Sequence, residues 1–490
     1  MNYNQILQPT GSEKTNSPII FGSILIVAIG VGYIIAKGGF QVAAILVALP
    51  FLVISLNRLI FKPELGLTVA FIINFIILGI TRYIPFTSGP LMDIILIVTY
   101  IAIFFHYFDK KLSLKPLNNE LVYFSIIWFV YLCAEFFNPE AISKTLWFVA
   151  VRGLGFYMMA VIPLVILLYN DPKHLKKFLY IWAIFSILGS IKAYMQMNIG
   201  PDPWEQRWLD QGGAVTHILL GNLRAFSFYS DAGQFGAAQG HIALVAAIIS
   251  IYEERLSMKI FWWITMIAGF YGMAMSGTRG AISIPFAGFA LYLVVRKNFK
   301  VLLIGALILA PVYAFFKFTT IGNTNYQIYR MRTAFAAEDD ASYQVRINNQ
   351  IIFESYLKTR PFGGGVGHAG DKALRYTPYA FLATVATDSW FVLIWAETGI
   401  IGLFLHMFII FYILGKSIYI VMFEIKSREL FGIEAALLCG YFGVILSSYG
   451  NAVLGQFPTG LIVYTSMAYM FMGPALDKKF LFLEASKQKS

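Results

Sequence analysis

The sequence predicts an all-α integral membrane protein with about fourteen transmembrane helices and one large loop that contains short helices. Only 13% of the 490 residues are charged, about half the roughly 25% of soluble proteins, and 58% are hydrophobic. A soluble chain with so few charges cannot cover its surface. The hydrophobic residues are also grouped in long segments. The composition therefore excludes a cytosolic enzyme, a disordered chain and, with two cysteines, a disulfide scaffold.

The predicted spans follow from apolar segments of about 20 residues, the length that crosses a bilayer. A tail at 1–17 precedes eleven spans within 18–317, which are interrupted by an outer loop near 200–235. The large loop at 318–387 leads to three further spans within 388–476, and a second tail follows at 477–490. The fourteen spans are 18–36, 40–57, 65–81, 92–107, 121–137, 152–169, 178–199, 236–252, 260–276, 280–296, 300–317, 389–416, 431–449 and 458–475.

The distribution of Lys and Arg predicts the orientation. Alternate connections, such as the one that holds Lys110, Lys111 and Lys115, carry most of the basic residues between the spans. Basic loops stay in the cytoplasm. Both tails are therefore expected to be cytoplasmic, and the two long loops are expected to face the exterior or periplasm.

Basic residues also occur at the opposite, outer ends of the spans, where the orientation rule does not require them. Arg152, Lys192, Arg224 and Arg279 lie there. A cation near the outer leaflet costs free energy unless it is paired. The candidate partners are protein carboxylates, the phosphates of a ligand or, through snorkelling, lipid headgroups.

Several motifs are absent from the sequence. It lacks G-x-x-x-x-G-K-[ST], which argues against ATP-driven transport, and H-E-x-x-H, which argues against a zinc hydrolase. The glycine-rich run at 363–367 lacks the lysine of a phosphate loop and is interpreted as a hinge. No cofactor and no metal are expected.

Four ordered segments around the large loop combine arginines, carboxylates and glycines. They are G-N-L-R-A-F-S-F-Y-S-D-A-G-Q-F-G at 221–236, S-G-T-R-G-A at 276–281, Y-Q-V-R-I-N-N-Q-I-I at 343–352 with T-R-P-F-G-G-G-V-G-H at 359–368, and D-S-W-F-V-L-I-W-A-E-T-G-I-I-G at 388–402.

Together these segments resemble the O-antigen ligase and O-antigen polymerase superfamily of membrane glycosyltransferases, over about residues 215–410. The resemblance rests on an arginine before a helix-opening turn, S/T-R-G-A at a span start, an arginine before P-x-G-x-G, and a helix with E-x-G-I-x-G. It implies a GT-C-like helical fold in the bacterial inner membrane. It also implies glycan transfer from undecaprenyl diphosphate at the periplasmic face, without a nucleotide donor.

Carried over residue by residue, the resemblance assigns two arginines and one carboxylate to catalysis. Arg279 and Arg346 match the arginines that grip the lipid diphosphate. Asp388 stands where ligases have a histidine, nine residues before Glu397. The further expected substrate-binding residues are Arg224, His368 and Glu397.

The chemistry of these side chains is consistent with that assignment. Guanidinium groups neutralise the charge on a departing diphosphate without a metal, and one in-line displacement inverts the anomeric carbon. Asp388 would orient or deprotonate the acceptor hydroxyl. An aspartate acts either fully ionised or with its pKa raised by burial, unlike a histidine. His368 therefore remains the alternative base, and Glu397 has the alternative role of positioning its helix.

The function within this class stays open at this point. A surface-polysaccharide polymerase is preferred, because fourteen spans fit that branch better. The alternatives are a ligase that attaches glycan to lipid A-core or to protein and, more distantly, an amphiphile transporter. The expected partners are the lipid-linked donor, a glycan or lipid A-core acceptor and membrane lipid, with a chain-length regulator left open. No nucleic acid is expected despite the net charge of +11.

Overall fold

The computed structural model divides the chain into two units, Met1–Lys62 and Pro63–Ser490. In the first unit, residues 54–62 are described, and they begin with a helical segment. All the elements below belong to the second unit. The structure describes residues 54–84, 88–335 and 341–488.

The beginning of the predicted topology lies outside the described residues. This applies to the predicted tail at 1–17, to the first predicted span at 18–36 and to most of the second at 40–57. Every predicted span from 65–81 onward is occupied by helix.

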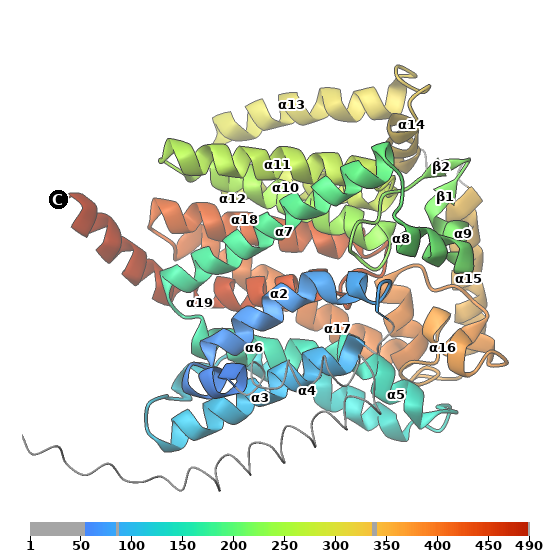
Figure 1. Cartoon of the computed structure of the whole chain (residues 1–490), viewed down its shortest axis with the longest axis horizontal. Coiled ribbons are helices and arrows are strands. Elements are labelled where there is room, and N and C mark those ends of the chain that lie inside the picture. Colours follow the sequence, from blue (N-terminus) through green and yellow to red (C-terminus); the bar gives the residue numbers. More distant parts are fainter. Residues whose placement is uncertain (1–53, 85–87, 336–340, 489–490) are drawn as a thin grey trace, which may run out of the picture. The chain divides into compact units, whose positions relative to one another are not determined.

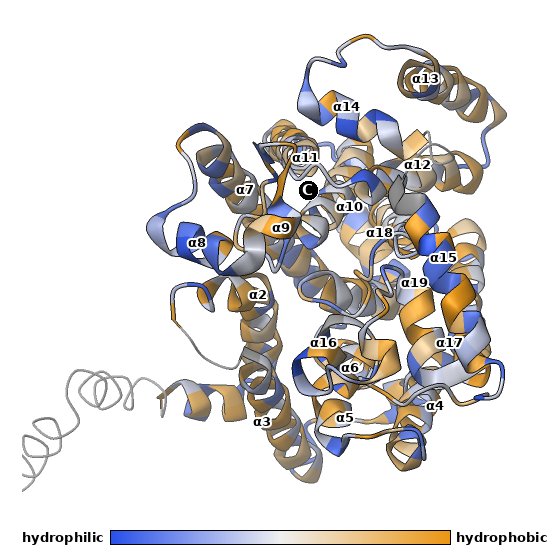
Figure 2. Ribbon diagram, turned by 90° about the vertical axis from the view of Figure 1, so that its right-hand side faces the viewer, coloured by the Kyte–Doolittle hydropathy of each residue, from blue (hydrophilic) through white to orange (hydrophobic). Residues whose placement is uncertain are grey.

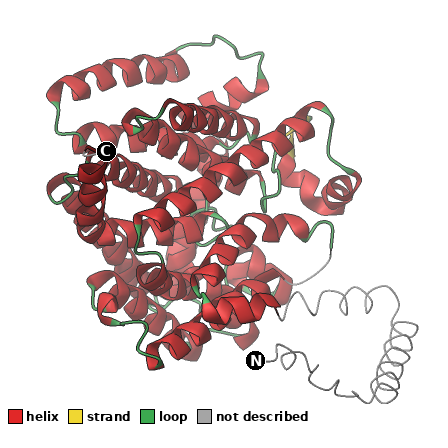
Figure 3. Ribbon diagram, turned by 60° about the vertical axis from the view of Figure 1, so that its left-hand side comes forward, coloured by secondary structure: helices red, strands yellow, loops and turns green. Residues whose placement is uncertain are grey.

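The described chain is almost entirely helical (Figure 3). Short 3₁₀ turns and two π-helical segments join some of the helices. The long helices are α2 (Glu64–Ile80), α3 (Ser88–Phe108), α4 (Glu120–Ala134), α6 (Tyr157–Leu168), α7 (Pro172–Asn198), α10 (Ala232–Tyr252), α11 (Leu256–Met275), α12 (Ser283–Val295), α13 (Phe299–Phe318), α17 (Trp390–Phe423), α18 (Arg428–Ser447) and α19 (Thr459–Gln488).

Eight helical segments among the described residues are long and apolar enough to cross a membrane. Three shorter apolar helices accompany them, at Glu64–Ile80, Arg279–Val295 and Leu302–Phe318. The protein is therefore a multi-pass helical membrane protein, as the composition predicts. The eight long segments are Gly89–Phe108, Glu120–Phe137, Lys144–Leu168, Pro172–Asn198, Ala232–Tyr252, Leu256–Met275, Trp390–Phe423 and Arg428–Ser447.

The connections contain shorter elements, as expected for the large loop. They also contain one small antiparallel hairpin, which pairs Ile218 with Leu223 and Leu219 with Asn222. Its two turn residues both have positive φ, the geometry of a tight hairpin turn. The short elements are α5 (Lys144–Val151), α8 (Pro203–Trp208), α9 (Ala214–His217), β1 (Ile218–Leu219), β2 (Asn222–Leu223), α14 (Tyr326–Arg332), α15 (Ala341–Leu357) and α16 (Gly370–Tyr376).

Helix α10 forms the centre of the helical core and packs most extensively against α11 and α18 (Figure 1). In the apolar 18-residue stretch of this helix, 89% of the residues are buried. Its first half reads A-G-Q-F-G-A-A-Q-G, and small residues of this kind let helices approach closely in a membrane. The carboxylate of Asp231 caps the start of α10 by accepting from the backbone N–H of Gln234 at 2.9 Å.

Helix α17 is broken where the predicted span at 389–416 was expected to be continuous. Gly399 has φ 66° and ψ −171°, a conformation that is essentially restricted to glycine. A Cβ atom there would lie 2.0 Å from the backbone oxygen of Pro361, so the glycine-rich loop fits directly against the break.

The short elements gather at one end of the long helices. In Figure 1, α8, α9, β1, β2, α14, α15 and α16 all lie on the right-hand side. Figure 2 shows hydrophilic residues on α8, α14 and α15, whereas α2 and α3 are mainly hydrophobic. The two long connections that the sequence places on one face of the membrane therefore lie at the same end of the helical bundle.

Candidate active site

Two neighbouring cavities of different chemistry lie at the end of the bundle that carries the loops. The larger, called here the apolar cavity, has a volume of about 470 Å³, and the smaller, the polar cavity, about 240 Å³. The apolar cavity is lined by Ile282, Phe286, Tyr313, Phe335, Leu446 and Arg279, among others. The polar cavity is lined by Asp231, Gln234, Thr387, Asp388, Asn451 and Gln456, among others.

Arg346 and Gly450 line both cavities and therefore mark the boundary between them. Arg279 lines only the apolar cavity, and Asp388 lines only the polar one. The Nε atom of Arg346 is 3.9 Å from the Oδ2 atom of Asp388. The structure thus brings together the three residues that the sequence assigns to catalysis.

The tight turn between α11 and α12 positions Arg279. Gly277 has φ 57°, which reverses the chain after α11. The hydroxyl of Thr278 donates to the backbone oxygen of Ala232 at 2.8 Å and fixes the turn to the start of α10. The hydroxyl of Ser447 donates to the backbone oxygen of Gly280 at 2.9 Å and attaches the turn to the end of α18.

Contacts with other elements hold Arg346 and Asp388 near each other. On α15, the amide of Asn349 donates to the backbone oxygen of Ala386 at 3.1 Å. Asp388 itself has φ 46°, a left-handed conformation that aspartate tolerates better than most residues. The N–H of Trp390 then donates to the backbone oxygen of Ser448 at 2.9 Å, so that the start of α17 lies against the end of α18.

The connection between α18 and α19 contributes site residues that the sequence analysis missed. Gly450 lines both cavities, and Asn451 and Gln456 line the polar one. A Cβ on Gly280 would lie 2.3 Å from the Nδ2 atom of Asn451, which explains the glycine after Arg279. The available signal was the run S-S-Y-G-N at 447–451, at the end of the span predicted at 431–449.

Arg224, a predicted substrate-binding residue, lines neither cavity. Its guanidinium donates to the backbone oxygens of Ser276 at 3.0 Å and Thr216 at 2.9 Å, and to the hydroxyl of Thr278 at 2.9 Å. Burial, followed by the nearby charge of Arg330, lowers the pKa of Arg224. In this structure Arg224 connects the β-hairpin segment to the turn that carries Arg279.

His368 also lies outside both cavities, although it was the alternative base. Its ring is 2% exposed. The Nδ1–H faces the backbone oxygen of Val366 at 3.1 Å, and Nε2 accepts from the N–H of Ser143 at 2.9 Å. Burial lowers the pKa of His368. With both nitrogens engaged, the ring holds the glycine-rich loop against the start of α5.

Glu397 holds two of the predicted signatures together. The N–H groups of Gly364 and Gly365 donate to the backbone oxygens of Ala396 and Glu397 at 2.9 and 3.0 Å. The Glu397 side chain is 2% exposed. Backbone hydrogen bonds therefore join P-x-G-x-G and E-x-G-I-x-G into one packed unit, and Glu397 lines neither cavity.

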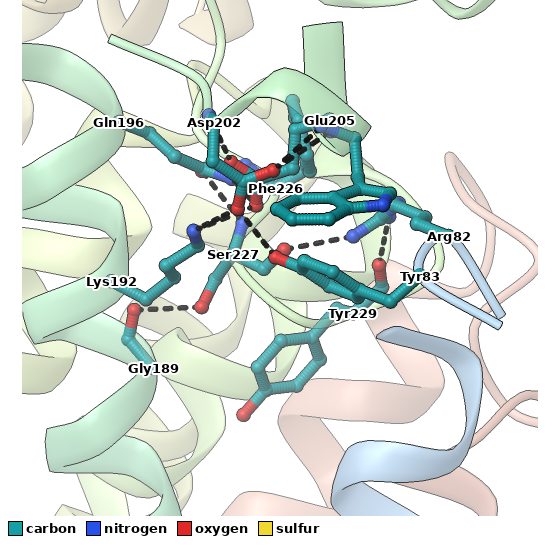
Figure 4. A network of polar contacts seen from close by, with 11 residues as sticks. Arg82, Tyr83, Gly189, Lys192, Gln196, Asp202, Glu205, Phe226, Ser227 and Tyr229 are labelled. Carbon is teal, nitrogen blue, oxygen red and sulfur yellow. Dashed lines mark hydrogen bonds and ion pairs between the residues drawn. The ribbon is translucent and has the colours of Figure 1, made fainter. Parts of the chain in front are cut away.

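Two other outer cations already have carboxylate partners. Arg152 lies 3.2 Å from Asp93. Lys192 lies 2.8 Å from Asp202 and 3.1 Å from Glu205 (Figure 4). The sequence left protein carboxylates, ligand phosphates and lipid headgroups as possible partners. For these two cations, the structure shows protein carboxylates.

Arg82 supports the segment that leads to the polar cavity. Its guanidinium donates to the backbone oxygens of Ser227, Tyr229 and Ser230. Figure 4 shows the contacts with Ser227 and Tyr229. The guanidinium also stacks on two aromatic rings. Burial lowers the pKa of Arg82 to about 10. The segment ends at Asp231, so this arginine helps to set the cavity wall.

Comparison with known proteins supplies the family. Residues 264–407 match the sequence profile of the family described as O-antigen ligase. The chain carries an O-antigen ligase domain. The domain contains Arg279, Arg346 and Asp388, and confirms the resemblance predicted from the four signatures.

The chain is also similar to a protein named O-antigen polymerase from Salmonella muenchen. The two are 27% identical over 340 residues, which cover 66% of this chain and 81% of the relative. Asp231, Gln234, Gly450 and Asn451 lie outside the O-antigen ligase domain in the sequence, yet they border the residues that it contributes.

Proposed function

We propose that the protein is a metal-independent, inverting membrane glycosyltransferase that transfers lipid-linked oligosaccharide from undecaprenyl diphosphate at the periplasmic face of the bacterial inner membrane. The observation that carries the proposal is the position of Arg346. It lies between an apolar cavity that contains Arg279 and a polar cavity that contains Asp388. A reaction between a lipid diphosphate and a sugar hydroxyl requires this combination of surfaces.

The apolar cavity suits the donor. Phe286, Tyr313 and Phe335 offer apolar walls to an isoprenoid chain, and Arg279 and Arg346 offer forked donors to its diphosphate. Guanidinium groups that are already in place stabilise the negative charge that develops on the leaving group. Among the described residues, the charged side chains that line this cavity are Arg279 and Arg346.

The polar cavity suits the acceptor. Asp388 takes up or orients the proton of an acceptor hydroxyl, whose oxygen attacks the anomeric carbon of the donor glycan. The new C–O bond forms as the bond from the anomeric carbon to the phosphate oxygen breaks. The electron pair leaves with the diphosphate beside Arg279 and Arg346, and the anomeric carbon inverts.

Within this class we favour a surface-polysaccharide polymerase. The relative from Salmonella muenchen is named O-antigen polymerase, and Asp388 replaces the histidine expected in ligases. The alternative is a ligase that attaches the glycan to lipid A-core or to protein, which the family description O-antigen ligase favours. The donor, the acceptor glycan and membrane lipid are the proposed partners, with a chain-length regulator as a further one for a polymerase.

Gel analysis of surface glycan in a deletion strain tests the proposal. A polymerase defect leaves a single repeat unit on the lipid anchor, whereas a ligase defect leaves long chains that are never attached. Complementation with the wild-type gene restores the ladder, and complementation with Arg346→Ala does not. A deletion strain with an unchanged glycan pattern contradicts the proposed transfer.

A further inference from the structure

The residues that line the polar cavity differ from those that line the apolar cavity, which is the proposed donor site. The walls of the polar cavity contain Asp231, Gln234, Thr387, Asp388, Asn451 and Gln456, and no aromatic ring among the described residues lines it. Its volume of about 240 Å³ is smaller than the roughly 300–1,000 Å³ of typical drug-sized sites. A cavity of this size and polarity suits one sugar ring and not an isoprenoid chain.

Two buried amides in this wall have hydrogen-bonding atoms without a partner among the described residues. Gln234 is 1% exposed, and its Nε2 donates to the hydroxyl of Thr459 at 2.7 Å, whereas its Oε1 has no partner. The buried Nδ2 of Asn451 also has none. Buried polar atoms are nearly always hydrogen-bonded. Both side chains line the polar cavity, and an amide group, like a sugar hydroxyl, can both donate and accept hydrogen bonds.

We infer that the polar cavity is the acceptor-sugar subsite of the transferase proposed above, and that Gln234 and Asn451 recognise the hydroxyl groups of the acceptor ring. The inference rests on the proposed function. It assigns the residues that select the acceptor to α10 and to the α18–α19 connection, outside the O-antigen ligase domain at 264–407.

The position of Gly450 agrees with this subsite. It lines both cavities, and a Cβ there would meet its nearest neighbour, Nη1 of Arg346, at 3.8 Å, an ordinary contact distance. A glycine is therefore not required by the backbone or by packing. Its lack of a side chain leaves room at the boundary where the acceptor hydroxyl has to meet the donor.

A pair of cysteine variants separates the two cavities experimentally. Thr387→Cys places a thiol in the polar cavity, and Ala287→Cys places one in the apolar cavity. Both are made in full-length protein with Cys133→Ser, while the buried Cys439 is kept. The rate of labelling by a small hydrophilic maleimide is measured with methyl glycosides of a hexose, a 6-deoxyhexose, a hexuronic acid and an N-acetylhexosamine, and with geranylgeranyl diphosphate.

At least one glycoside is expected to slow the labelling of Thr387→Cys and to leave that of Ala287→Cys unchanged. Adding Asn451→Ala to Thr387→Cys should weaken that protection by about tenfold, the loss of one hydrogen bond. The matched control, Ser283→Ala in the apolar cavity, should not. Protection of Thr387→Cys by the diphosphate alone, by no probe, or to an equal degree in the Asn451→Ala variant overturns the inference.

The same measurements distinguish this inference from the proposed function. If geranylgeranyl diphosphate fails to protect Ala287→Cys while a glycoside protects Thr387→Cys, the donor site is wrong and the sugar subsite stands. If the diphosphate protects Ala287→Cys and no glycoside protects Thr387→Cys, the donor site stands and the sugar subsite is wrong.

Discussion

The guanidinium of Arg346 and the carboxylate of Asp388 face each other at 3.9 Å across the boundary between the two cavities. This distance is longer than the roughly 2.7–2.9 Å of a charge-assisted hydrogen bond. Their side chains also keep 32% and 43% of their exposure, and ion pairs this exposed contribute little to stability. The pair is therefore suited to exchange partners, with the arginine turning to a phosphate and the aspartate to a hydroxyl.

The first prediction concerns the two cavity arginines. Arg279→Ala and Arg346→Ala should each reduce glycan transfer about 10²–10³-fold, the usual effect of removing one donor to a developing anion. Arg279→Lys should also be strongly impaired, because an ammonium group cannot make the forked contact. Transfer per amount of folded membrane protein is the measurement. The exposed Arg207, in the connection between α7 and α10, provides the control variant Arg207→Ala. Normal transfer by both alanine variants removes these arginines from the site.

The second prediction concerns Asp388. Asn tolerates the left-handed backbone at this position about as well as Asp does. Asp388→Asn therefore removes the charge without adding strain, and transfer should fall about 10²–10⁴-fold, the contribution of a general base. Membrane levels and the unfolding temperature should stay at the wild-type values. An unchanged transfer rate would assign the base to another group.

The sequence predicts the local features of this protein well, because they depend on composition and short patterns. Apolar segments of sufficient length became helices from 65–81 onward. Arg279, Arg346 and Asp388 come from separate signatures, and the structure brings all three to the two cavities. The resemblance assigned these three residues to one reaction, which requires them to lie near one another.

Features that depend on tertiary contacts could not be predicted from the sequence. Hydropathy predicts a continuous span at 389–416. It cannot reveal the break at Gly399, because the break depends on the glycine-rich loop that packs against it. Asn451 carries no motif, and only the folded chain brings it beside Gly233 of α10 and Gly280 of the turn before α12. Arg224 and Arg279 look alike in sequence, yet backbone oxygens surround Arg224, whereas Arg279 lines a cavity.

The third prediction concerns the topology. Thr324→Cys, in the loop after α13, should react with a membrane-impermeant maleimide in intact cells. Lys426→Cys, between α17 and α18 at the opposite end of the helices, should react only after permeabilisation. Both positions are exposed, so access to each thiol depends on the side of the membrane. The reverse labelling pattern would invert the orientation that the basic residues predict.

The fourth prediction concerns the acid stability of the connection between α7 and α10 near Asp202 (Figure 4). Burial by itself raises the pKa of Asp202, but hydrogen bonds from Lys192 and Tyr83 outweigh it and lower the pKa to about 2. This is below the unfolded value of about 3.9. The carboxylate therefore stabilises the fold above about pH 4, and this contribution is lost as the pH falls toward about 2.

Unfolding temperatures of the purified protein across this range test the pH dependence. At neutral pH, Asp202→Asn should lower the free energy of unfolding by about 1–2 kcal/mol, which is less than the full pKa shift implies because solvent screens this partly exposed pair. Below about pH 4 the difference between wild type and variant should shrink, because the wild-type carboxyl becomes protonated in the unfolded chain before it does in the folded protein. The exposed Asp210 gives the control Asp210→Asn. A difference that stays constant between about pH 5 and 3 contradicts the assigned pairing.

The fifth prediction separates the two roles of Arg224. If it mainly connects backbone segments, Arg224→Met leaves the oxygens of Ser276 and Thr216 without their donor, at a cost of about 1–3 kcal/mol. The unfolding temperature and the amount of folded protein should then fall, and total transfer should fall in proportion. Arg279→Met is the matched comparison, and it should reduce transfer far more than stability. A variant Arg224→Met that keeps its stability and loses transfer would show instead that Arg224 contacts the substrate, as the sequence predicts.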